Sequence, residues 1–301
     1  MIVRNDSITE GSISELADYQ VIYDAVFPYD PNVQTYIDAA GITDVTQKEA
    51  VNTLVLGLKA ANIWDKIDLI MPILGGSEAS HLTNLKGPGT WVSFGSWTHS
   101  SQGMIGGGTN SFFLTSVDMS AYTHARQLDV HVGAYVSQPS STGLRMVGGI
   151  LNNSADNYAR IGLGYSNGVN FYGGAYGDLT GNAFGTTFKR FIVVNTYYPN
   201  LAPKPAPPSA AWATASVYKN AVQLIENANG AWSPISGSYD DQFAIGAMYW
   251  AGQPNNVYLD DGTFNGYIKY LSIGGGFTSG EITTYNTLVE NYQTALGRSE
   301  A

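Results

Sequence analysis

The chain has 301 residues, a formal net charge of −10 and only 13% charged residues. This acidity disfavours binding to phosphate backbones, and no stretch approaches the ~18 apolar residues of a membrane-spanning helix. Cysteine is absent, which excludes disulfides and thiolate metal sites.

Residues 1–29 differ from the rest, because their apolar side chains follow no sustained helical or strand period. Two interpretations carry equal weight: an arm that lies on the domain, or an attachment segment that is ordered only against a partner. The first residues also lack the basic-then-apolar order of a signal peptide. We therefore divide the chain into an N-terminal arm, 1–29, and a folded part, 30–301.

Two helices open the folded part. Asp30 and Pro31 have the residue types of an N-cap and first helical position, and Gly41 ends this helix after about Ala40. Thr46 to Glu49 matches a capping box, which predicts a second helix that ends near residue 62. An apolar strand over 67–74 follows.

From residue 91 the pattern changes to short apolar runs with turn residues every 8–12 positions, which is typical of a β-sandwich or barrel. A proline-rich loop, 197–208, interrupts the series because proline lacks the ladder donor. The predicted strands are 91–96, 111–117, 125–137, 143–152, 157–165, 168–173, 188–196, 212–226, 242–249 and 264–273.

A strand and one well-capped helix close the chain. The strand has large apolar residues at both parities, so we expect it to be covered on both faces. Thr278 and Glu281 form a capping box, Phe277 can pack on Ile282, and Gly297 marks the end of the helix. The expected class is therefore mainly β, with two N-terminal helices and one C-terminal helix.

Catalytic patterns are sparse. A glycosidase needs two carboxyl groups about 5–10 Å apart, and Glu226 is the only glutamate between Glu78 and Glu281. Gly164 to Gly168 matches G-x-S-x-G, but another strand pattern follows where a hydrolase has a helix. We predict no catalytic residue and no enzyme.

Metal sites are also weakly indicated. Asp129 and His131 would share a strand face near His124, and two acidic doublets, Asp240-Asp241 and Asp260-Asp261, resemble Ca²⁺ loops. Ordinary turn chemistry is the preferred explanation of the doublets, so we predict no metal and no cofactor. Ca²⁺ remains an unsupported alternative.

Aromatic residues near predicted loops are the remaining candidates for a binding site. An aromatic face with amides nearby suits a sugar ring, although tryptophan in a sandwich is most often a core residue. The candidate carbohydrate-binding residues are Trp97, Trp212, Trp232, Tyr249 and Trp250.

Several ordered segments resemble a module of bacteriophage virion proteins. They include Tyr36–Asp44, Leu58–Lys66, Pro72–Gly76, Trp97–Ser101 and Phe277–Arg298, and the likeness is collinear over about 31–110 and 243–298. The resemblance implies a concanavalin A-like (laminin G-like) jelly roll displayed on a tail, fibre or head appendage. It carries no catalytic residue.

The resemblance also implies partners and a location. The leading hypothesis is a non-enzymatic virion structural protein, assembled in the host cytoplasm, with its arm on other virion proteins. In this hypothesis the protein associates with itself as a trimer and contacts a glycan on the host surface. It binds no nucleic acid and does not insert into a membrane. A carbohydrate-binding adhesin is the alternative, and a polysaccharide depolymerase is the least favoured one.

Overall fold

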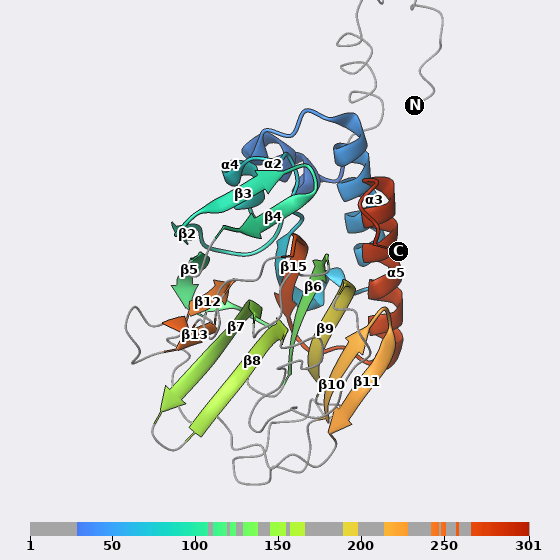
Figure 1. The fold of residues 1–301 in the computed structure, drawn as a ribbon. Coiled ribbons are helices and arrows are strands. Elements are labelled where there is room, and N and C mark those ends of the chain that lie inside the picture. Colours follow the sequence, from blue (N-terminus) through green and yellow to red (C-terminus); the bar gives the residue numbers. More distant parts are fainter. Residues whose placement is uncertain are drawn as a thin grey trace, which may run out of the picture.

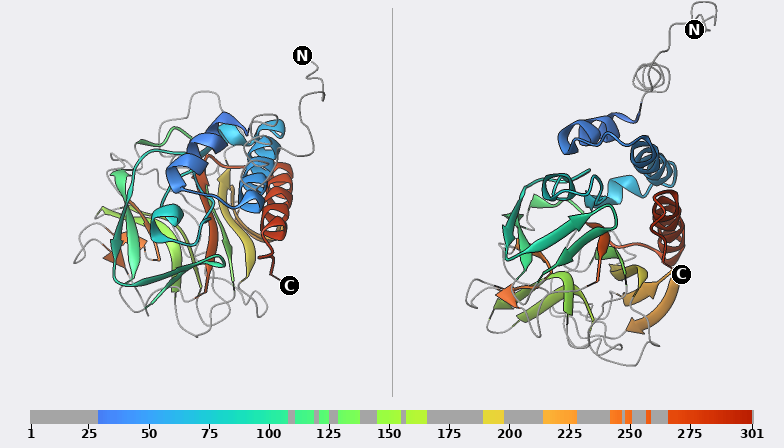
Figure 2. Two further views of the ribbon diagram at one scale, coloured as in Figure 1. Left: turned by 90° about the horizontal axis from the view of Figure 1, so that it is seen from above. Right: turned by 45° about the horizontal axis from the view of Figure 1, so that its top comes forward.

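A computed structural model provides the fold (Figure 1). The described residues are 29–107, 111–118, 121–124, 129–137, 145–154, 157–165, 189–197, 214–227, 242–246, 248–250, 257–258 and 266–300. Within them the chain is mainly β, with two sheets and a few helices, which agrees with the expected class. In the view of Figure 1 the helices lie along the top and the right of the sheets, and Figure 2 shows them from two further directions.

The first sheet has eight strands in the order β11-β10-β9-β6-β15-β4-β3, and β1 also pairs with β15. Its strands are β1 (Ile67–Met71), β3 (Trp97–Ser100), β4 (Gly103–Gly106), β6 (Val130–Val136), β9 (Arg190–Tyr197), β10 (Thr214–Lys219), β11 (Val222–Asn227) and β15 (Ile268–Gly274).

The second sheet has seven strands in the order β14-β13-β7-β12-β5-β2, and β8 pairs with β7. Its strands are β2 (Trp91–Phe94), β5 (Phe112–Asp118), β7 (Arg145–Ser154), β8 (Asn157–Tyr165), β12 (Gln242–Ile245), β13 (Met248–Trp250) and β14 (Val257–Tyr258).

The first sheet has an apolar core on each face. Leu271 and Ile273 of β15 point into the core between the sheets, whereas Tyr270 points toward the helices. Every residue of β15 is buried, which confirms the expectation of a strand covered on both faces. Such a strand alternates between two apolar environments, so its sequence shows no apolar–polar alternation.

Helices α2 (Pro31–Ala40), α3 (Val45–Ala60), α4 (Glu78–His81) and α5 (Ser279–Ala295) complete the fold, with a 3₁₀ turn at Trp64–Lys66. The Asp30 cap and the Gly41 end are as predicted. The predicted Thr46 box is wrong, because the side chain of Asp44 accepts the N–H of Gln47 and α3 begins at Val45. An Asp two positions earlier provides the same cap.

The C-terminal capping box is confirmed. Thr278 accepts the N–H of Glu281, and Glu281 accepts the N–H of Thr278 in return. Phe277 and Ile282 are both buried in the helix-side core, and Gly297 has φ +64° just after the helix. This segment was readable because its signals are local.

Three strand predictions need correction. The single strand over 212–226 is a hairpin, since Asn220 and Ala221 take positive φ and turn the chain. The run 242–249 is broken at Gly246, with φ +80°. Strands β3 and β4 were not predicted, because residues 97–106 carry few β-branched side chains. The predicted strand 168–173 and the loop 197–208 lie mostly or wholly outside the described residues.

Over the described part of the chain, no helix is both long and apolar enough to span a membrane.

Candidate functional site

One edge strand passes from the second sheet to the first. Strand β2 pairs with β5, Phe94 opposite Phe112, and strand β3 pairs with β4, Trp97 opposite Gly106. Gly95 takes φ +70° between them, and Ser96 stays bonded to the partner ribbon, accepting the N–H of Gly107 at 2.8 Å. We call residues 91–100 the bent edge.

The bent edge lies at the border of both sheets. Among the described residues, β2 and β3 are the last strands of their sheets, and each pairs with another strand on one side. In an antiparallel edge strand, alternate N–H and C=O groups therefore face outward.

The sequence of the bent edge and of the residues on either side of it is uncharged. No Asp, Glu, Lys or Arg occurs from Gly87 to Val117, although the whole chain carries 38 such residues. Ser93, Ser96 and Thr98 are exposed along the edge itself. The surface therefore offers hydroxyl and amide groups without a formal charge.

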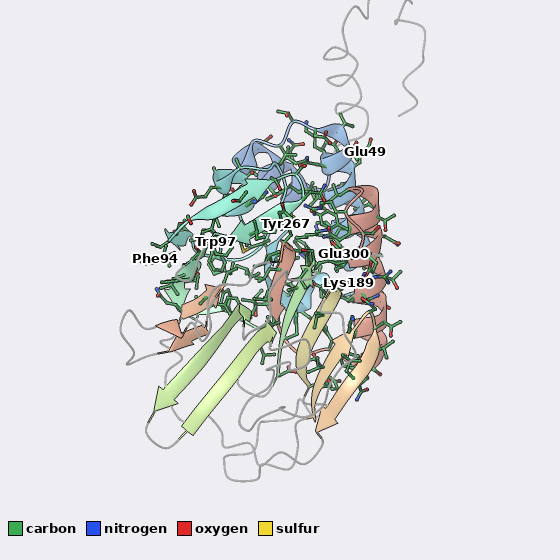
Figure 3. All side chains as sticks on the ribbon, in the orientation of Figure 1. Glu49, Phe94, Trp97, Lys189, Tyr267 and Glu300 are labelled. Atoms are coloured by element: carbon green, nitrogen blue, oxygen red, sulfur yellow. The ribbon has the colours of Figure 1, made fainter. Side chains whose placement is uncertain are left out.

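Two apolar side chains stand out from this polar edge. Phe94 is 39% exposed and Val92 is 49% exposed. The Phe94 ring stacks on Phe112 with centroids 4.5 Å apart and an angle of 15° between the rings. Phe112, its partner across the two strands, is buried and covers one face of the Phe94 ring. Phe94 itself lies at the border of the molecule (Figure 3).

Trp97 faces inward from the other half of the bent edge. Its ring stacks on Phe113, with centroids 4.4 Å apart, and packs against the core between the sheets. Gly246 makes room for the indole, because a Cβ there would lie 3.0 Å from the ring. The indole N–H is buried without a hydrogen-bond partner.

His99 and His81 continue the inner side of the bent edge. The N–H of Gly76 donates to Nε2 of His81 at 3.2 Å, so the neutral His81 ring carries its proton on Nδ1. That Nδ1 lies 2.9 Å from Nδ1 of His99 and donates to it. His99 must then be protonated on Nε2, which is buried and has no partner.

Burial keeps this pair neutral. It lowers the pKa of His81 to about 3, helped by His99 and Arg298. Burial also lowers the pKa of His99, and Glu78 opposes that shift. An added proton would displace a bond, since His81 Nε2 and His99 Nδ1, the two acceptor nitrogens, are both occupied.

The other histidines have separate partners. His124 Nδ1 lies 2.9 Å from Asp68, and the buried His131 bonds the carbonyl of Gly275 at 2.7 Å through Nδ1. Among the described residues, no group of three potential ligands could hold a metal ion. The Asp129–His131–His124 grouping is thus not brought together as a site there.

Of the predicted aromatic residues, the structure describes the side chain of Trp97 alone. Trp97 lies on β3 of the first sheet, and Tyr249 and Trp250 belong to β13 of the second sheet, which begins two residues after Gly246, beside the Trp97 ring. The side chains of Tyr249 and Trp250 lie outside the described part, as do Trp212, Trp232 and the acidic doublets. Glu226 lies on β11, in the outermost strand of the first sheet.

Phe94 was not among the predicted site residues. The charge-free run around it is visible in the sequence and could have drawn attention to this segment. Its exposure could not be read, because alternation alone does not tell which face of an edge strand is covered.

Comparisons with known proteins give structural matches only. No family model matches the chain, and no curated protein matches it by sequence. A mutant of Trypanosoma rangeli sialidase displaying trans-sialidase activity is similar with a TM-score of 0.51 and 12% identity. The match covers 82% of this chain and 38% of the sialidase.

Two further matches are weaker. Trypanosoma rangeli sialidase gives a TM-score of 0.48 at 12% identity, over 79% of this chain and 38% of that one. The other match is domain 4 of AbnA, a GH43 extracellular arabinanase from Geobacillus stearothermophilus, in complex with arabinotriose. Its TM-score is 0.43 at 15% identity, and the match covers 73% of this chain and 99% of that domain. The virion role stays a prediction.

The prediction that this chain is not an enzyme is corrected by the first of these matches. That structure is a sialidase mutant that displays trans-sialidase activity, and it is therefore an enzyme. Its identity to this chain is too low to transfer a reaction, and the chain spans only 38% of that structure's length. The similarity therefore shows a shared fold and no more.

Proposed function

We propose that this chain is a carbohydrate-binding protein with a lectin-like β-sandwich, and that the bent edge binds a neutral glycan. The exposed Phe94 ring, covered on one face by Phe112, is the observation that carries the proposal. The C–H face of a sugar can lie on such an aromatic platform.

The polar groups around the platform suit sugar hydroxyls. Ser93, Ser96 and Thr98 are exposed beside it, and the outward backbone groups of β2 add donors and acceptors. No charged residue lies within the segment 87–117. An acidic sugar would find no cation from this segment, which favours a neutral ligand.

The placement on a bacteriophage particle rests on the sequence. The collinear resemblance over 31–110 and 243–298 supports a concanavalin A-like jelly roll displayed on a tail, fibre or head appendage. In this proposal the N-terminal arm attaches the protein to other virion proteins, and the sandwich contacts the host surface. Mass spectrometry of purified particles, with immunogold labelling, tests the placement, and absence from particles contradicts it.

The glycan site is tested by changing the platform. We expect Phe94→Ala to weaken glycan binding about fivefold, because an aromatic contact contributes about 1 kcal/mol beyond the area it buries. A glycan array finds the ligand, and calorimetry then gives the dissociation constants of both proteins.

Val222→Ala is the matched control, because Val222 is an exposed apolar residue on β11, outside the bent edge. It should bind the glycan as the unchanged protein does. An array without any bound glycan contradicts the proposed function, and equal binding by Phe94→Ala moves the site away from the bent edge. Analysis of the glycan after incubation tells binding from cleavage.

A further inference from the structure

The exposed positions of helices α3 and α5 are poor in charge, and the charged residues Lys48, Lys59, Glu281 and Glu290 of these helices are half-buried. The exposed positions of α5 carry only Ser, Gly, Thr, Asn and Ala: Ser279, Gly280, Thr283, Thr284, Thr287, Asn291, Thr294 and Ala295. On α3 the exposed positions are Thr46, Glu49, Thr53, Leu56 and Ala60, so Glu49 is the one charged residue among them. Exposed helices more often carry Lys and Glu, which favour both helix and solubility.

The threonines of α5 make this surface less polar than its composition suggests. The hydroxyl of Thr283 donates to the carbonyl of Ser279 at 3.0 Å, and that of Thr287 donates to Thr283 at 3.0 Å. Thr284 donates to Gly280 at 3.1 Å. Since these hydroxyl donors are already satisfied, the surface can be covered without new partners for them.

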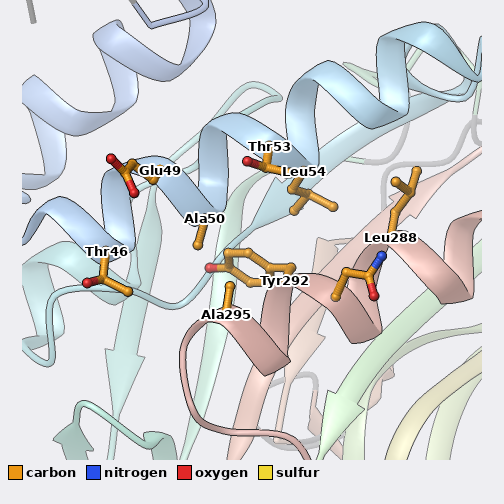
Figure 4. Close-up of a pocket in the computed structure, with 9 residues that line it drawn as sticks. Thr46, Glu49, Ala50, Thr53, Leu54, Leu288, Tyr292 and Ala295 are labelled. Carbon is orange, nitrogen blue, oxygen red and sulfur yellow. The ribbon is translucent and has the colours of Figure 1, made fainter.

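A groove and an exposed leucine lie side by side on this surface. The groove, about 240 Å³, runs between the helices and is floored by Ala50, Leu54 and Tyr292, with Thr53 and Glu49 at its rim (Figure 4). Leu56, 50% exposed, follows Thr53 by three residues on the same helix. Positions three apart face the same side of a helix, so Leu56 projects beside the groove.

We propose that α3 and α5 form a two-fold interface between two copies of this chain, in which Leu56 of each copy fills the groove of the other. A two-fold interface places the same surface on both partners, so a projection and a matching hollow on one surface are self-complementary. The α3–α5 surface and the bent edge lie on different sides of the molecule, which leaves both glycan sites accessible (Figures 1 and 2).

Charge favours a second copy at this surface. Two chains of net charge −10 repel one another over most approaches. The repulsion is smallest where the facing surfaces carry few charges, and α3 and α5 present Glu49 alone at their exposed positions.

The area is sufficient for a weak dimer. Helices of 16 and 17 residues are about 25 Å long, and two side by side are about 20 Å wide. The surface is therefore about 500 Å² per copy and about 1,000 Å² in all, at the lower limit for a specific interface. We expect a dimer that forms as the protein concentration rises.

Sedimentation equilibrium over a wide concentration range tests the proposal. The unchanged protein should pass from monomer to dimer, and Leu56→Ser should weaken the dimer on the order of 100-fold, because one leucine is lost from each of two contacts. A protein that remains monomeric, or that forms a trimer, overturns the proposal. So does a Leu56→Ser protein that dimerises unchanged.

A mixture of two variants tests the contact itself. Thr53→Gln covers the groove with a longer polar side chain but keeps Leu56, whereas Leu56→Ser keeps an open groove. Each variant alone has lost both contacts, while a mixed dimer regains one, so it should form about tenfold more tightly than either alone. No gain on mixing overturns the proposal. Val222→Ser should dimerise as the unchanged protein does. If it weakens the dimer as much as Leu56→Ser does, the association is nonspecific and the proposal is overturned.

Discussion

Phe94 and Trp97 are three residues apart, yet they belong to different surfaces. The turn at Gly95 and Ser96 carries the strand from one sheet to the other between them. Phe94 therefore rests on Phe112 at the solvent face, whereas Trp97 rests on Phe113 at the core. An aromatic side chain is therefore exposed to solvent at position 94 and packed against the core at position 97.

The His81–His99 pair shows how one backbone group sets the protonation of two side chains. The Gly76 N–H donates to Nε2 of His81, so the proton of the His81 ring is on Nδ1. This Nδ1 donates to Nδ1 of His99, so the proton of the His99 ring is on Nε2. Nitrogen-15 chemical shifts should report His81 protonated on Nδ1 and His99 protonated on Nε2.

We expect the pair to make the protein less stable in acid. The pKa of His81 is about 3 in the folded state, against about 6.5 in the unfolded chain. The unfolded chain takes up the proton first, so stability is complete above about pH 6.5 and is lost as the pH falls toward 3. The loss approaches about 1.4 kcal/mol per pH unit from this group alone. Urea unfolding at several pH values measures it.

His81→Gln should have a lower free energy of unfolding at pH 7. Between about pH 3 and pH 6.5 this free energy should fall less steeply with acid than in the unchanged protein, by the uptake of about one proton on unfolding. His131, whose pKa burial lowers to about 4, keeps its own contribution in that variant. An unchanged pH dependence in His81→Gln would contradict the assignment.

At the scale of elements, left-handed backbone positions decide where strands and helices end. Asn220 and Ala221 both take positive φ at the β10–β11 turn, with φ 50° and 62°. Gly297 takes φ +64° after α5. Glycine adopts this conformation without cost, whereas an L-residue with a Cβ is strained there.

We expect Ala221→Gly to raise the free energy of unfolding by about 1 kcal/mol, because it removes that strain from the turn. Gly297→Ala is the reverse exchange at the same backbone conformation and should lower it by about 1 kcal/mol. No atom lies within 4 Å of a Cβ at Gly297, so strain is the cause there. Chemical denaturation compares the two variants, and the same sign for both would refute the explanation.

At the scale of the whole molecule, the C-terminal residues join separate parts of the fold. The buried Arg298 guanidinium donates to the carbonyl of Ile73 at 2.8 Å, to that of Lys269 at 3.3 Å and to the side chain of Gln293 at 3.1 Å. Lys269 also pairs with Glu300. These contacts link β15, α5 and the segment after β1.

Arg298→Ala should lower the free energy of unfolding by about 3 kcal/mol, because it leaves several buried carbonyl groups without donors. Ser299→Ala, at the exposed neighbouring position, should change it by less than about 0.5 kcal/mol. Urea denaturation of both proteins gives the comparison. A small effect of Arg298→Ala would mean that water replaces the guanidinium at these carbonyls.

The sequence by itself determined the mainly β class, the order of the terminal helices and the capping of α5. These features depend on local signals, such as the Thr278–Glu281 box and the Asp30–Pro31 start, that act within a few residues. It also determined the charge-free run from 87 to 117.

Only the tertiary structure decided which side chains of that run face solvent. Strand pairing places Phe94 over Phe112 and turns Trp97 toward Phe113, and both contacts depend on residues that the sequence pattern does not order in space. The His81–His99 bond and the Leu56 groove likewise join separate elements. Local patterns specify elements, whereas exposure and contact arise from how the elements pack, which no short stretch of sequence contains.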